Sequence, residues 1–129
     1  MGLCYEHHLL IKFTPRGLLT DIVVRSGGCL EERAVRVYVV DVLKGLDYLH
    51  MSLIVHGDIK QSNVVVGVDG CAKFADYRCT RTTVDSVQES DGMPMFMALE
   101  VAHREEQGPV ANMWALGCIV VSVIKKIRL

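Results

Sequence analysis

The chain has 129 residues, so we expect one domain at most. Its net charge is -1 and no basic stripe is visible, so we expect no nucleic-acid partner. Half of its residues are hydrophobic, which is a high share for so small a domain. The five cysteines are scattered without Cys-x-x-Cys spacing, which argues against a disulfide framework or a zinc site and indicates reduced thiols. No signal peptide is visible, and we expect a location in the cytoplasm, with the nucleus as an additional location.

The first elements expected along the chain are short. The apolar run at residues 7–13 indicates a strand that ends in a turn at residues 14–17. Residues 17–24 have the pattern of a short helix that ends at Ser26-Gly27-Gly28. Residues 30–51 form the longest periodic segment, and their apolar residues recur at steps of three and four, which predicts an amphipathic helix with one buried stripe.

Residues 54–66 combine two β-branched runs, which predict short strands, with a polar stretch between them. In that stretch Asp58 can accept a proton from a hydroxyl, and Lys60 can neutralise charge that builds on a phosphoryl group. Asn63 can offer its amide oxygen to a metal ion. This combination suits phosphoryl transfer, in which positioning and charge neutralisation supply most of the catalysis. The alternative is a hydrogen-bonded loop that carries no chemistry.

The second half of the chain contains a predicted hairpin, a polar segment and an apolar helix. The apolar runs at residues 64–66 and 71–74 flank an Asp-Gly turn, which predicts two antiparallel strands. Residues 79–92 are polar and predict an exposed loop or a mobile segment. Residues 112–124 are apolar on nearly every side, which predicts a helix buried all round. This helix is too short for a bilayer, which needs about 20 apolar residues, so we expect no membrane partner.

Three short motifs follow one another along the chain: His56-Gly57-Asp58 with Asn63 after it, Asp76-Tyr77-Arg78, and Ala98-Leu99-Glu100. They resemble the protein kinase markers His-Arg-Asp with its later Asn, Asp-Phe-Gly and Ala-Pro-Glu, in that order. The position of Lys60, two residues after Asp58, is typical of serine/threonine kinases. Further stretches are similar to plant mitogen-activated protein kinase kinase kinases, namely residues 45–50, 94–98, 105–109 and 114–118.

This resemblance covers nearly the whole chain and implies a fold. We expect a mainly α structure with short β-hairpins, like the C-terminal lobe of a protein kinase. Residues 1–129 would then be a partial kinase domain with the hinge at residues 11–14, followed by the catalytic loop, the activation segment and the central helix. The chain has no room for the nucleotide-binding lobe before residue 7 and ends near the central helix, so we expect a domain truncated at both ends.

The resemblance also implies roles for the residues that match the kinase motifs. Asp58 would be the catalytic base, and Lys60 would contact the transferred phosphate. Asn63, which belongs to the same loop, would hold magnesium together with Asp76. Val65 would lie under the adenine, so the implied cofactors are ATP and Mg2+. The implied partner is a protein, either as substrate or as a binding partner.

Several positions depart from the kinase pattern. Gly57 replaces the Arg of His-Arg-Asp, and Arg78 replaces the Gly of Asp-Phe-Gly, where Gly permits backbone angles that cost other residues energy. Met93 replaces a Thr whose hydroxyl would reach the catalytic loop, and Leu99 replaces the Pro of Ala-Pro-Glu. Asn112 replaces the Asp that usually braces the catalytic loop, which exchanges a charge-assisted hydrogen bond for a neutral one.

These observations leave three functional hypotheses. The first is a serine/threonine kinase domain that transfers the γ-phosphoryl group of ATP. The second is a pseudokinase that acts by binding a protein partner. The third is a degenerate gene product without a folded role. Because the parts that normally hold the triphosphate are missing from the printed sequence, we expect this chain by itself to show neither tight ATP binding nor measurable phosphate transfer.

Overall fold

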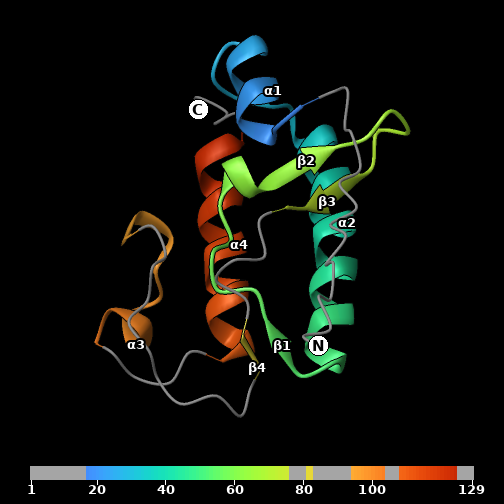
Figure 1. The fold of residues 1–129 in the computed structure, drawn as a ribbon. Coiled ribbons are helices and arrows are strands. Elements are labelled where there is room, and N and C mark those ends of the chain that lie inside the picture. Colours follow the sequence, from blue (N-terminus) through green and yellow to red (C-terminus); the bar gives the residue numbers. More distant parts are fainter. Residues whose placement is uncertain (1–16, 76–80, 83–93, 104–107, 125–129) are drawn as a thin grey trace, which may run out of the picture.

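The helices and strands are described for residues 17–75, 81–82, 94–103 and 108–124, in a computed structural model (Figure 1). Helices predominate, and the described strands form two separate antiparallel pairs, in agreement with the fold that the kinase resemblance implied. No helix within the described ranges is long and apolar enough to cross a membrane. In chain order the elements are α1 (Leu19–Arg25), α2 (Glu32–Met51), β1 (Ile54–Val55), the 3-10 turn η1 (Gln61–Asn63), β2 (Val64–Val66), β3 (Ala72–Phe74), β4 (Arg81–Thr82), the 3-10 turn η2 (Pro94–Phe96), α3 (Leu99–Ala102) and α4 (Pro109–Val123).

The long helix predicted at residues 30–51 is confirmed as α2, which begins two residues later than the pattern suggested. Its buried residues are Val35, Val42, Leu46 and Leu49, which lie on one stripe of the helix because they are spaced by three, four or seven positions. This stripe packs towards α4, the other long helix, and the two helices lie alongside each other in Figure 1. The short helix expected at residues 17–24 is also present, as α1.

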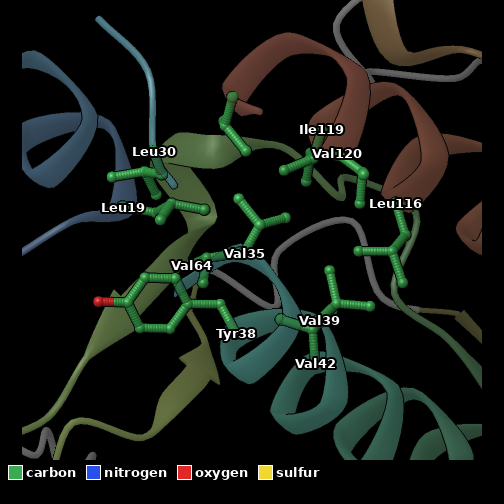
Figure 2. A pocket seen from close by; sticks show the side chains of 11 residues that line it. Leu19, Leu30, Val35, Tyr38, Val39, Val42, Val64, Leu116, Ile119 and Val120 are labelled. Atoms are coloured by element: carbon green, nitrogen blue, oxygen red, sulfur yellow. The ribbon is translucent and has the colours of Figure 1, made fainter. Parts of the chain in front are cut away.

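The hydrophobic core lies between α1, α2, β2 and α4. A cavity of about 20 Å³ lies at their junction. Its lining includes Val35, Val64 and Ile119 (Figure 2). The only polar side-chain atom in this lining is the hydroxyl of Tyr38, which points away from the other labelled side chains. A space of this size could hold about one water molecule, but such a water needs two to four polar partners. We therefore treat this cavity as a dry packing gap rather than as a ligand site.

The predicted hairpin is confirmed, because β2 and β3 pair antiparallel with Val64 opposite Phe74 and Val66 opposite Ala72. In the turn, the N–H of Cys71 donates to Asp69 Oδ1 at 3.0 Å, which fixes the Asp side chain against the backbone. Successive side chains of a strand point to opposite faces. Val64 and Val66 accordingly enter the core, while Val65 is half-buried on the other face of β2.

The hairpin rests on α2 through two close contacts. The N–H of Ala72 donates to Asp41 Oδ2 at 3.0 Å. At Gly45 a Cβ atom would lie 3.1 Å from the ring of Phe74, closer than most real contacts, so the missing side chain lets the ring approach the helix. These contacts fix the end of β3, and the chain passes from there into the site described below.

One backbone contact joins the start of α2 to the end of α4. The N–H of Leu30 donates to the carbonyl oxygen of Val123 at 2.7 Å, and Leu30 forms an isolated parallel bridge with Ile124. Leu30 and Val123 are both buried, so water does not compete for this hydrogen bond. The contact closes the described fold by joining two segments that are far apart in sequence.

Two sequence predictions are wrong in part. The helix expected at residues 112–124 is confirmed as α4, but it begins earlier, at Pro109, and is not buried all round, because Val110, Trp114 and Val121 are exposed. The reason is that α2, η2 and β1 pack against only part of its surface. The segment at residues 79–92 is not all loop, because β4 pairs antiparallel with β1 and so satisfies part of its backbone edge. The strand and hinge expected within residues 7–14 lie outside the described residues.

Candidate active site

The predicted catalytic loop runs from β1 to β2 and brings Asp58, Lys60 and Asn63 together. Asp58 is buried, and its Oδ2 lies 3.3 Å from the Lys60 Nζ. The Asn63 Nδ2 donates both to the same Oδ2, at 2.9 Å, and to the backbone oxygen of Asp58, at 2.8 Å. The two neighbours therefore fix the direction of the Asp58 carboxylate through one of its two oxygens.

The arrangement leaves two oxygen atoms for other chemistry. Within the described chain, no hydrogen bond or ion pair occupies Asp58 Oδ1, so this oxygen can accept the proton of a hydroxyl. The amide of Asn63 directs its nitrogen towards Asp58, which leaves its oxygen Oδ1 for a different partner. Amide and carboxylate oxygens are the ligands that Mg2+ prefers, so the donor set of the loop fits this ion.

His56 holds the start of the loop through hydrogen bonds to the backbone. Its Nδ1 accepts the N–H of Asp58 at 3.2 Å, so in the neutral ring the proton is on Nε2, which lies 3.2 Å from the backbone oxygen of Ala75. The ring is fully buried and packs against Phe74 at a centroid distance of 5.2 Å. His56 thus joins the Asp58 backbone to the end of β3.

Asn112 of α4 also holds the start of the loop. The N–H of Gly57 donates to its Oδ1 at 3.3 Å, which confirms the bracing contact that the resemblance implied. Its Nδ2 lies 3.0 Å from Nε2 of His50, near the end of α2. Gly57 has φ of 83°, in the left-handed region that favours glycine. The loop is therefore anchored to both long helices.

Sequence reasoning missed two residues that act on the loop. His50 ends the kinase-like stretch at residues 45–50, and no pattern in the sequence predicts a contact for it. Ser122 accepts the Gln61 Nε2 at 2.7 Å, and its own hydroxyl donates to the backbone oxygen of Ile119. The available signal was that Asn112 and Ser122 are polar residues in an otherwise apolar helix. Asn112 is buried and therefore needs hydrogen-bond partners, whereas Ser122 is exposed.

The remaining two predicted site residues, Asp76 and Val65, make no described contact with this cluster that would test their roles. Asp76 lies outside the described residues, so its role as a magnesium ligand stays a prediction. The N–H of Ala75, its chain neighbour, donates to the backbone oxygen of Asn63 at 2.8 Å. Val65 is half-buried on the face of β2 that is turned away from the core, and its contact with adenine also stays a prediction. The described residues contain no group of three or more His, Cys, Asp or Glu that could hold a metal ion.

One anchored loop thus holds a proton acceptor, a neighbouring ammonium group and an amide oxygen. This is the combination of groups that suits phosphoryl transfer. The model of the protein kinase domain family matches residues 4–129, and the chain belongs to this family. Mitogen-activated protein kinase kinase kinase 17 of Arabidopsis thaliana is 45% identical over 120 residues, which are 92% of this chain and 32% of that protein.

Two further relatives agree with this assignment. Mitogen-activated protein kinase kinase kinase 18 of Arabidopsis thaliana is 42% identical over 125 residues, 95% of this chain and 37% of the relative. Serine/threonine-protein kinase PAK 1 of Mus musculus is 31% identical over 123 residues, 93% of this chain and 22% of the relative. The chain therefore resembles part of a plant serine/threonine kinase, and it spans about a third of the length of the two Arabidopsis proteins.

Proposed function

We propose that this chain provides the catalytic loop of a serine/threonine protein kinase. ATP, bound together with Mg2+, is the phosphoryl donor, and a protein hydroxyl is the acceptor. The observation that carries the proposal is the geometry at Asp58. Lys60 and Asn63 both contact its Oδ2, which leaves Oδ1 for the incoming hydroxyl. The similarity to Arabidopsis kinases over more than nine tenths of the chain supports the same conclusion.

In this proposal each residue of the loop has one task. Asp58 orients the hydroxyl of the substrate and accepts its proton through Oδ1. Lys60 lies beside the carboxylate, and its ammonium group neutralises charge on the transferred phosphoryl group. Asn63 would bind Mg2+ through its amide oxygen, with Asp76 as the second ligand, and the ion would neutralise phosphate charge when bound. Val65 offers an apolar surface to the adenine.

The test replaces the matched segment of the 45%-identical Arabidopsis kinase with this chain, so that the loop works in a complete domain. We expect the chimera to phosphorylate a generic basic protein. Asp58→Asn keeps the size of the side chain but removes its proton-accepting charge, and it should lower the rate by at least about 100-fold. A chimera that shows an ATP- and Mg2+-dependent thermal shift but transfers no phosphate would contradict the proposal.

Protein binding without catalysis is the second candidate function. The observation that favours it is the exposed apolar face of α4, which includes Val110, Met113, Trp114 and Val121. Large contiguous apolar surfaces often mark interaction sites. In the chimera experiment, this candidate predicts a folded domain that transfers no phosphate, either with Asp58 or with Asp58→Asn.

A further inference from the structure

The side chain of Asn112 lies between two groups that come from different parts of the fold. It is only 1% exposed, so water cannot replace a lost partner. Its Oδ1 accepts the Gly57 N–H at 3.3 Å, and its Nδ2 lies 3.0 Å from the His50 Nε2. Asn112 therefore bridges the end of α2 and the residue directly before Asp58.

The chemistry of the bridge determines which proton His50 carries. A side-chain amide has one accepting end and one donating end. The backbone N–H of Gly57 can only donate, so the accepting end of Asn112 must face it. The donating end then faces His50, whose Nε2 has to present a lone pair. The bridge thus requires a neutral His50 with its proton on Nδ1.

We propose that His50 is a positioning residue of the catalytic loop, which orients Asn112 towards the Gly57 N–H only while the imidazole is neutral. When His50 gains a proton, its Nε2 becomes a donor, and Asn112 stands between two donors. Whichever way the amide turns, it can then accept from only one of them. The consequence of this positioning for catalysis rests on the proposed function, but the positioning of Asn112 by His50 does not.

The surroundings of His50 favour the neutral form. Burial lowers the pKa of His50 below its ordinary value, and the nearby carboxylate of Asp47 only partly offsets this effect. Within their bounds, neither α4 nor β1 contains a charged residue, and on β3 the Lys73 ammonium group pairs with Asp69. On β4, Arg81 stands opposite Val55 in the strand register. Asp47 is therefore the one described acidic group that acts on His50.

The sign of the pH effect follows from this direction. A histidine whose pKa is lower in the folded state binds fewer protons folded than unfolded. Its contribution to stability is complete above the unfolded pKa of about 6.5 and decreases as the pH falls towards the folded value. We expect the hydrogen bond to Gly57 to weaken over the same pH range.

The test is a nuclear magnetic resonance titration of the full chain from about pH 8 to pH 5, the range in which histidine charge changes. We expect the Gly57 amide shift to follow the His50 ring signal with one midpoint, and the exchange protection of this amide to decrease in acid. His50→Gln supplies an acceptor that does not titrate, so the Gly57 signal should become independent of pH. His103→Gln, at an exposed histidine, is the matched control and should leave the Gly57 titration unchanged.

Asn112→Asp provides a second and opposite test. A carboxylate can accept from both neighbours, so the bridge should tolerate a protonated His50, and the His50 midpoint should rise. Two results would overturn the proposal: a Gly57 titration that persists in His50→Gln, which would assign it to His56, or a Gly57 amide that does not respond while His50 titrates. Because His50→Gln and Asn112→Asp are independent variants, misfolding of one leaves the other decisive. Since neither readout uses phosphate transfer, a failed chimera would leave this result intact.

Discussion

The two faces of α4 have similar apolar side chains but opposite surroundings. On the inner face Leu116, Ile119 and Val123 are buried in the core, whereas on the outer face Trp114 and Val121 are exposed. Asn112, the polar side chain that accepts the Gly57 N–H, belongs to the inner face. The difference shows that apolar composition sets what a helix is able to bury, while its neighbours decide which face becomes buried and which polar atoms find partners.

The strongest test of this comparison uses the same substitution on both faces. Val123 is 2% exposed and Val121 is 67% exposed, only two positions away. Val123→Ala should lower the free energy of unfolding by about 2–3 kcal/mol, because it removes two buried methyl groups and leaves a cavity. Val121→Ala should change it by less than about 0.5 kcal/mol. Urea denaturation measures both, and equal losses would mean that both faces are buried in solution.

The second prediction concerns the polar residue of the inner face. Asn112→Ala leaves the half-buried Gly57 N–H without its acceptor and should lower the free energy of unfolding by about 2 kcal/mol, within the range for a donor that loses its partner. Met113→Ala, one position further and on the exposed side, is the matched control. Hydrogen exchange should show the loss at Gly57 first. Unchanged protection of this amide would show that the Asn112 contact does not form.

The third prediction asks whether the loop geometry that Asn112 supports depends on glycine. Gly57→Ala places a Cβ on a residue with φ of 83° and should cost about 1–2 kcal/mol. Leu53, after the end of α2, has φ of 58° and is exposed, so Leu53→Gly should add up to about 1 kcal/mol of stability. Thermal unfolding of both variants measures the two changes in stability. A stabilising Gly57→Ala would mean that the loop has a different backbone conformation.

The smallest effect on stability is expected on the outer face. Trp114→Gln should change the free energy of unfolding by less than about 0.5 kcal/mol, because this side chain is largely exposed. It should, however, reduce concentration-dependent association, since exposed apolar patches promote it. Light scattering over a concentration series measures this change. Strong destabilisation by Trp114→Gln would show that the outer face is covered by the chain itself.

The sequence predicted the parts of the fold that depend on local pattern. The periodicity of residues 30–51 and the Asp-Gly turn after β2 were sufficient for α2 and the hairpin. The exposure of α4 could not be read from its composition, because burial depends on which elements pack against it. The pairing of β4 with β1 was missed for the same reason, since a two-residue strand has too little pattern to stand out.

The candidate site was predicted in its chemistry but not in its supports. Asp58, Lys60 and Asn63 are close in sequence, so one loop can group them, and the structure does. The contact between Gly57 and Asn112 joins positions far apart and was reached only through the kinase resemblance. The role of His50 could not be predicted, because it depends on the direction in which one buried amide points.

The backbone contact between Leu30 and Val123 has a consequence for the way the chain folds. Closing a loop costs conformational entropy that grows with its length, whereas α2 and the β2–β3 hairpin form through local contacts. We therefore expect the end of α4 to dock late. During synthesis α2 and the hairpin leave the ribosome before α4 has been made, so their apolar faces stay uncovered until α4 docks. Chaperone dependence of the nascent chain should consequently end only after α4 has emerged.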